Sequence, residues 1–321
     1  MTMKVLIVID GSSCSKMTVN MLKALKLPHK THVTVMTVVP DHSFLGGLSF
    51  SRFKGNSPEK NDLQESLHEQ AAYLLQTTAE ELSTAKLETE VLVRQGNPAE
   101  VILKVARESV PSLIVMGAKG ISDSQQFLLG SVAQKVMRHA PTSIMLVKKE
   151  TTSIDRVLLA TDGSGNSEIA AWFLLNLPLP RSEVVLATAV QSYIEAFIKA
   201  PTLNLQANQD TIARLQAGEE EEALKIISKI EKLFSKRHYK TLSLVMRGGA
   251  AESILKVAKE YKPDLITLGA KGLTAIGPFL LGSVAERVAL HAECSVLICR
   301  APIEDASRVP LPPLPRKTNL E

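Results

Sequence analysis

The stretch from Val5 to Ser12 reads VLIVIDGS, and 152 positions later the stretch from Val157 to Ser164 reads VLLATDGS. The same offset relates GNPAEVILKVA at 96–106 to GGAAESILKVA at 248–258, and an unchanged FLLGSVA at 127–133 and 279–285. About half of the positions between 91 and 148 match their partners. Because self-similarity at one fixed offset is the signature of duplicated structural units, we expect two copies of one domain, at 1–150 and 154–301.

Each copy alternates short apolar stretches with amphipathic ones. The first copy is expected to contain strands at 4–9, 31–39, 87–94, 113–116 and 143–148, and helices at 13–26, 58–84, 98–108 and 131–139. The second copy follows the same order, with its long helix near 210–236. Strands that alternate with helices predict a parallel sheet covered on both faces. The expected fold class is α/β, with two tandem doubly wound five-stranded parallel-sheet domains.

Composition and charge narrow the class of protein. Hydrophobic residues make up 45% and charged residues 22% of the chain, as in ordinary soluble domains. The net charge is +4, and Lys and Arg interleave with Asp and Glu, which argues against nucleic-acid binding. The first residues lack the features of a signal peptide, and no stretch approaches 18 uncharged apolar residues. We therefore expect a cytoplasmic protein without membrane contact.

Three cysteines, Cys14, Cys294 and Cys299, form no C-x-x-C pair. Their odd number argues against a disulfide framework. Cys294 and Cys299 flank one apolar stretch and are five positions apart, so we expect their side chains on opposite faces of a strand.

A glycine-containing loop follows the fourth predicted strand of each copy. It reads Gly117-x-x-Gly120, then nine residues, then Gly130-Ser131. We expect the first glycines to permit positive φ and to let backbone N–H groups approach a ligand closely. Gly130-Ser131 opens a helix, whose free N–H groups and partial positive charge suit a phosphate. The Ser131 hydroxyl can cap the helix or donate to a phosphate oxygen.

The second copy repeats this loop as Gly269-x-x-Gly272, nine residues, then Gly282-Ser283. The pattern is neither a Walker A loop nor the dinucleotide G-x-G-x-x-G motif. Lys119 and Lys271, inside the turns, either neutralise phosphate charge or face solvent. Each piece alone is common in turns, but the ordered combination at one spacing in both copies favours a nucleotide site.

Asp10 ends the first predicted strand. In a doubly wound sheet the first and fourth strands flank the point where strand order reverses, and ligands bind beyond their carboxyl ends. Asp10 and the Gly117 loop are therefore expected to meet in one crevice. A carboxylate there accepts hydrogen bonds from ribose hydroxyls or from an adenine amino group, although Asp-Gly-Ser after a strand also forms an ordinary helix N-cap.

Over nearly its whole length, at residues 3–148 and 155–300, the chain resembles the universal stress protein family in its tandem form. The resemblance rests on the complete G-x-x-G, nine residues, G-Ser/Thr pattern in both copies. It implies an adenine nucleotide α-hydrolase-like or flavodoxin-like topology and ATP, with Mg²⁺, held in the crevice of each copy. The residues that it implies as nucleotide contacts are Asp10, Val38, Gly117, Gly120, Gly130, Ser131 and Val132 in the first copy, and Asp162, Val190, Gly269, Gly272, Gly282, Ser283 and Val284 in the second.

The two loops depart from the family pattern differently. Ile121 and Leu273 stand where many ATP-binding members have a basic residue, and the first loop contains Asp123. A carboxylate beside a triphosphate is unfavourable unless a metal bridges them. The second loop has Gly277-Pro278 in place of two glutamines. We therefore expect unequal affinities, with the second site the tighter.

The function that these features favour is an ATP-binding regulatory protein of the stress response, not an enzyme, with at most slow hydrolysis. One alternative is a slow ATPase or adenylate-transferring enzyme of the same fold group. The other is an interaction module whose nucleotide loops are vestigial.

The ends of the copies suggest how they assemble. The last strands, at 143–148 and 295–300, are expected to meet edge to edge, because unpaired edges seek partners. The result is a tandem pseudo-dimer, which can dimerise again or bind an unknown protein partner. The Pro-rich segment 302–321 is expected to be a disordered tail.

Overall fold

The structure is a computed structural model that describes residues 3–28, 30–41, 58–120, 129–179, 182–190, 209–272 and 281–301. Several sequence features lie outside these residues. They are Ile121, Asp123, Leu273, Gly277-Pro278 and the Pro-rich tail.

The two halves contain the same elements in the same order. The first half contains β1 (Lys4–Val8), α1 (Ser13–Ala24), β2 (His32–Val39), α3 (Pro58–Ser83), β3 (Glu88–Gln95), α4 (Pro98–Ser109), β4 (Leu113–Gly117), α5 (Ser131–His139) and β5 (Ser143–Val147). The second half contains β6 (Arg156–Ala160), α6 (Gly165–Leu175), β7 (Glu183–Val190), α8 (Gln209–Ser235), β8 (Lys240–Arg247), α9 (Ala250–Tyr261), β9 (Leu265–Gly269), α10 (Ser283–His291) and β10 (Ser295–Cys299). The expected elements are confirmed to within one or two residues at each end.

Capping residues explain where the helices begin. Ser12 is the N-cap of α1, and its hydroxyl accepts the backbone N–H of Ser15. Asn97 caps α4 in the same way, with Pro98 in the first turn, where its fixed φ is already helical. These short-range signals set the direction in which each helix leaves the carboxyl end of the preceding strand.

The ten strands form one sheet in the order β3-β2-β1-β4-β5-β10-β9-β6-β7-β8. Among the strands that the structure describes, all pairs are parallel except β5 with β10, which are antiparallel and join the two halves. The doubly wound five-stranded sheet of each half and the edge-to-edge meeting of the closing strands are thereby confirmed. Within each half the order corresponds to 3-2-1-4-5, whereas flavodoxin has 2-1-3-4-5. Of the two expected topologies, the adenine nucleotide α-hydrolase-like one is observed.

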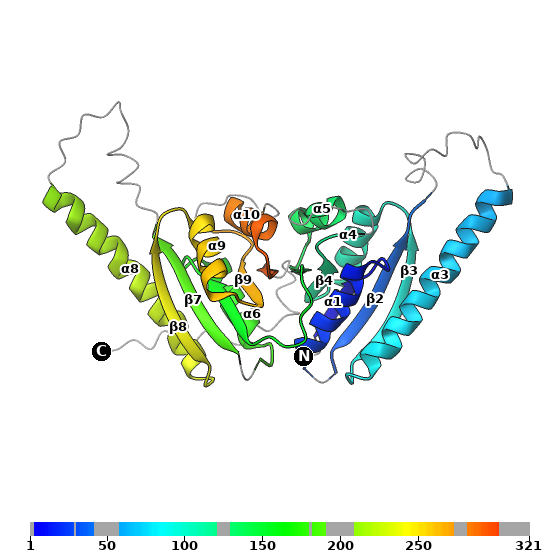
Figure 1. Ribbon diagram of the computed structural model, residues 1–321, viewed down its shortest axis with the longest axis horizontal. Coiled ribbons are helices and arrows are strands. Elements are labelled where there is room, and N and C mark those ends of the chain that lie inside the picture. Colours follow the sequence, from blue (N-terminus) through cyan, green and yellow to red (C-terminus); the bar gives the residue numbers. More distant parts are fainter. Residues whose placement is uncertain are drawn as a thin grey trace, which may run out of the picture.

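Helices cover both faces of the sheet, and neighbouring residues of each strand enter different cores. Val5 and Ile7 of β1 pack with α1 and α3, whereas Leu6 packs with α4 and α5. Each core continues across the β5–β10 pair into the second half. The long helices α3 and α8 lie at the outer flanks, and α5 and α10 lie together at the centre (Figure 1). Two layers of helices thus enclose a continuous buried sheet.

The cysteines behave as expected. All three are free thiols, and Cys294 and Cys299 are buried in the cores on opposite faces of the sheet. No helix within the described ranges combines the length and the apolarity needed to cross a lipid bilayer.

Candidate functional site

The site of each half lies where strand order reverses. In the first half β1 pairs with β2 on one side and with β4 on the other. Val8 and Met116 are register partners, so the chain segments that follow β1 and β4 leave the sheet side by side. This arrangement brings Asp10 and the Gly117 turn to the same crevice.

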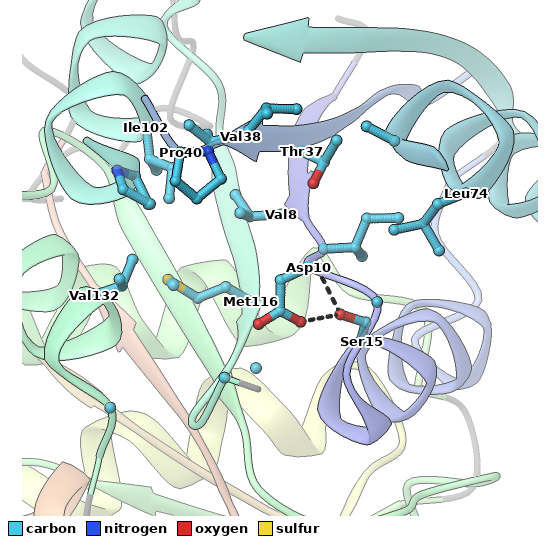
Figure 2. A pocket seen from close by; sticks show the side chains of 18 of the residues that line it. Val8, Asp10, Ser15, Thr37, Val38, Pro40, Leu74, Ile102, Met116 and Val132 are labelled. Carbon is cyan, nitrogen blue, oxygen red and sulfur yellow. Dashed lines mark hydrogen bonds between the residues drawn. The ribbon is translucent and has the colours of Figure 1, made fainter. Parts of the chain in front are cut away.

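The Asp10 carboxylate is held in place by the start of α1. Its Oδ1 accepts the backbone N–H of Ser12 at 3.0 Å and the hydroxyl of Ser15 at 2.7 Å. The Asp10 N–H donates in turn to Ser15 Oγ at 2.8 Å (Figure 2). Gly11 has φ of +79°, a conformation that favours glycine and turns the chain back toward the carboxylate.

The glycine turn approaches this carboxylate closely. A Cβ added to Gly120 would lie 3.0 Å from Asp10 Oδ2. A Cβ on Gly117 would lie 2.8 Å from Cys14 Cβ, below normal contact distance. Neither glycine has positive φ, so that expectation is wrong. Glycine is required here because α1 and Asp10 leave no room for a side chain.

Burial affects the protonation of the Cys14 thiol, which lies next to the glycine turn. Cys14 is half-buried beside Gly117, and this burial raises the pKa of its thiol. The thiol therefore stays protonated at neutral pH and serves as a packing group.

The helix that follows the loop begins with open N–H groups. Gly130 and Gly282 are the N-cap residues of α5 and α10, and neither helix has a side-chain cap. The Gly130 N–H donates to Ala118 O at 2.8 Å, which ties the helix start to the turn. Ser131 is the first helical residue, so its hydroxyl does not cap α5.

A cavity of about 520 Å³ opens between these elements in the first half. That volume lies within the range of small-molecule sites, about 300–1,000 Å³. All seven residues named for this copy line it: Asp10, Val38, Gly117, Gly120, Gly130, Ser131 and Val132. Lys119 lines it as well.

Several lining residues were not named from the sequence. Thr37 and Pro40 come from the end of β2, Leu74 from α3 and Ile102 from α4, and all four point toward the same space (Figure 2). The apolar faces of α3 and α4 are visible in the sequence. The sequence does not show which turn of each helix reaches the cavity, because that depends on how the helices cross the sheet.

The second half has an equivalent cavity of about 350 Å³. Six of the seven residues named for this copy line it: Asp162, Gly269, Gly272, Gly282, Ser283 and Val284. Among the described residues, Val190 is not part of this lining. It borders a separate cavity of about 30 Å³ near Arg247, while Ala189 lines the main one.

The carboxylate of the second half has a different network. Asp162 Oδ1 accepts the Ser164 N–H at 3.0 Å, as Asp10 does from Ser12. Ser167, the counterpart of Ser15, instead donates to Ser164 O at 2.8 Å and accepts the Thr161 hydroxyl at 3.1 Å. The threonine stands where the first half has Ile9, so one substitution redirects the serine. In the described parts of the chain, three or more His, Cys, Asp or Glu residues nowhere gather as a metal site.

Comparison with known proteins gives one consistent family. A profile of the universal stress protein family matches residues 1–148 and 153–300. Universal stress protein MJ0531 of Methanocaldococcus jannaschii is 33% identical over 147 residues, which are 46% of this chain and 82% of that protein.

The fold is shared with a solved structure that spans most of the chain. A universal stress protein from Archaeoglobus fulgidus superposes on 92% of this chain and 98% of its own, with a TM-score of 0.62 and 20% identity. A universal stress protein in complex with cAMP matches 46% of this chain and 97% of its own, with a TM-score of 0.33 and 22% identity.

Proposed function

Because the chain belongs to the universal stress protein family, we propose that it is a regulatory stress-response protein that binds ATP in each half. The observation that carries the proposal is the cavity in which Asp10, the Gly117 turn and the start of α5 converge. The second half repeats that convergence with Asp162, the Gly269 turn and α10. We further propose that residues 1–150 and 154–301 act as the two nucleotide-binding domains.

The phosphates would lie on the glycine turn and the helix start. The first N–H groups of a helix lack partners within the helix and carry partial positive charge. Ser131 and Val132, at the start of α5, line the cavity of the first half, and Ser283 and Val284, at the start of α10, line that of the second. Main-chain donors at a helix start bind phosphate without any basic side chain.

The nucleoside would fill the deeper part of the cavity. Asp10 offers its second oxygen, Oδ2, to ribose hydroxyls or to the adenine amino group. The apolar side chains of Leu74 and Ile102 would face the base, and the end of β2 at Val38 would supply a main-chain contact. In the second half the corresponding contact is proposed at the end of β7, where Val190 follows Ala189.

Mg²⁺ would bind together with the nucleotide. It is usually held by one or two carboxylates and by substrate phosphates. Asp10 and Asp162 each place one carboxylate beside a glycine turn, so the same carboxylate would serve either the ion or the nucleoside. When bound, the ion would offset phosphate charge, and the chain's own residues would orient the nucleotide.

We propose a binding role and not a catalytic one. Asp10 is held by the Ser12 N–H and the Ser15 hydroxyl, which suits recognition of a fixed ligand. Turnover slower than about one per minute, far below typical enzymes, is the expected result of a steady-state assay. Faster turnover would favour the enzyme alternative.

Calorimetry on protein refolded without nucleotide tests the proposal. ATP with Mg²⁺ should bind with a stoichiometry near two per chain, and cAMP and GTP serve as competitors. Mass spectrometry of the small molecule that copurifies with the chain gives an independent identification. An absence of any ATP binding, with the protein folded, would remove the proposed function.

A further inference from the structure

Each half ends its last strand with a cation that reaches into the other half. Lys148 directly follows β5, and Arg300 directly follows β10. The two positions are equivalent in the repeat, and the antiparallel β5–β10 pair lies between them. The exposed fraction of Arg300 is only 8%, so this residue is buried in the interface between the halves.

Both cations donate to carbonyl groups at the end of the equivalent helix in the opposite half. The Lys148 ammonium donates to Ala292 O at 2.5 Å and to Leu290 O at 3.4 Å. The Arg300 guanidinium donates to Met137 O at 2.8 Å and to Arg138 O at 3.4 Å. The acceptors of Lys148 lie at the C-terminal end of α10, and those of Arg300 lie at the C-terminal end of α5. Each cation therefore caps a helix of the opposite half.

Backbone hydrogen bonds hold the cations in register. The Lys148 N–H donates to Ser295 Oγ at 3.3 Å, and the Arg300 N–H donates to Ser143 Oγ at 3.2 Å. These serines begin the opposite strands. Because the strand pairing places the end of one strand beside the start of the other, each side chain is directed at a helix end that its own half does not contain.

The capped helices are the ones proposed to bind phosphate. Both α5 and α10 have nine residues, so about 13 Å separates the helix start from the capped end. Helices this short are marginal without tertiary support. The last carbonyls of a helix lack internal partners and carry partial negative charge, so a cation there stabilises the helix. Loss of that support should loosen the helix as a whole, including its phosphate-facing start.

We propose that Lys148 and Arg300 are positioning residues that act across the interface: Lys148 supports the phosphate-binding helix of the second half, and Arg300 supports that of the first. The inference rests on the proposed function, because it assigns each nucleotide site a supporting residue from the other half. It makes the tandem arrangement necessary for both sites.

The test replaces the two cations in the full-length chain and monitors each helix separately. The variants are Lys148→Met and Arg300→Met, with Lys148→Arg and Arg300→Lys as variants that keep the charge. Lys149→Met is a matched control, because Lys149 is the exposed neighbour and its ammonium pairs with the Asp264 carboxylate and not with a helix end. Hydrogen exchange detected by mass spectrometry is measured on peptides covering α5 and α10, first without nucleotide and then along an ATP titration.

The expected result is a crossed pattern. Lys148→Met should increase exchange in α10 and weaken ATP protection at Gly282–Val284 by about five- to tenfold in Kd, while Gly130–Val132 changes less than about twofold. Arg300→Met should instead increase exchange in α5 and weaken ATP protection at Gly130–Val132, while Gly282–Val284 changes little. The charge-keeping variants and Lys149→Met should remain close to the unmodified chain.

The two proposals fail in distinguishable ways. If ATP protects neither helix in the unmodified chain but the crossed loosening occurs without nucleotide, the proposed function fails and the positioning role stands. If ATP binds but each substitution loosens both helices equally, or only the helix of its own half, the crossed support is overturned. If a Met variant does not fold but the variant that keeps the charge at the same position does, the result supports the positioning role. If neither of these two variants folds, the result contradicts it.

Discussion

In the first half the hydroxyl of Ser15 binds the Asp10 carboxylate, whereas in the second half the equivalent Ser167 is occupied by Thr161 and Ser164. The backbone is repeated, and both carboxylates still accept the N–H two residues further along. A single replacement, of Ile9 by Thr161, has therefore changed how one carboxylate is held. Duplicated sites can retain their main-chain cradle while their side chains diverge.

The cavities differ in the same region. The first is about 520 Å³ and reaches Thr37 and Leu74, and the second is about 350 Å³ with Ala189 in place of Thr37. The hydrogen bond from Ser15 to the Asp10 carboxylate favours nucleotide binding in the first half. The acidic Asp123 in the loop of the first half disfavours a triphosphate there. For this reason we propose that the second site binds ATP more tightly. Calorimetry fitted to two sites decides between these opposing effects.

The largest expected effect compares the two glycines that end β4 and β9. A Cβ on Gly269 would lie 2.7 Å from the backbone carbonyl carbon of Asn166, whereas one on Gly117 would meet the side chain of Cys14. We expect Gly269→Ala and Gly117→Ala each to cost about 2–3 kcal/mol in unfolding free energy. Chemical denaturation measures this loss.

A second substitution separates the two cases. Cys14→Gly removes the atom nearest to the new Cβ at Gly117, so the double variant should be more stable than the sum of the single effects predicts. Asn166→Gly leaves the clashing carbonyl in place, so Gly269→Ala should show no such relief. Equal relief in both halves would contradict the contacts described here.

The next effect concerns the pH dependence of the interface. Burial lowers the pKa of Lys148 to about 8, from 10.5. Between these values the unfolded chain binds the proton that the folded chain has lost, so this group makes stability rise with pH in that window. After allowance for partial exposure, the rise should be about 2 kcal/mol between pH 8 and 10.5.

Because other groups titrate in the same pH range, the quantity to follow is a difference in unfolding free energy between two chains. The unfolding free energy of the unmodified chain minus that of Lys148→Met should rise across the window and be flat between pH 6 and 7.5. Burial lowers the pKa of Arg300 only to about 10, so Arg300→Met should show no such difference near pH 8.5. A flat Lys148 difference would show that the ammonium is better solvated than its surroundings indicate.

A smaller effect tests the divergence of the carboxylate networks. Ser15→Ala should weaken ATP binding in the first half by about fivefold, because both hydrogen bonds between the Ser15 hydroxyl and Asp10 are lost. Ser167→Ala should change the second site by less than about twofold, because Ser167 does not hold Asp162 in the same way. Protection of Gly130–Val132 and of Gly282–Val284 in hydrogen exchange reports the two sites separately. Equal losses of ATP affinity at the two sites would mean that both serines act only by stabilising α1 and α6, and not by holding a carboxylate.

The smallest effect comes from a contact that only one side of the interface has. Arg138 of α5 pairs with Glu286 of α10 at 2.5 Å, and the equivalent positions hold Leu290 and Gln134, which cannot form an ion pair. Because the Arg138 side chain is about half exposed, Arg138→Met should cost no more than about 1 kcal/mol, and less at high salt. Thermal unfolding at two ionic strengths measures the change. A larger cost that salt does not reduce would indicate that the apolar stem of Arg138, and not its charge, stabilises the interface.

Much of this protein follows from the order of its residues. The repeat offset, the alternation of apolar and amphipathic stretches, and the position of Asp10 and Gly117 after strands predict two doubly wound sheets with a crevice in each. These features are local or periodic, and backbone geometry converts them directly into strands, helices and their carboxyl ends.

Other features are decided only by packing in three dimensions. The sequence does not reveal that Gly117 is needed for a close approach to Cys14, that Val190 lies apart from the second cavity, or that Lys148 and Arg300 cap helices of opposite halves. Each depends on distances between segments far apart in the chain, set by how helices cross the sheet and how the two sheets join. Periodicity determines which face of an element is buried, but only the assembled structure determines what that face meets.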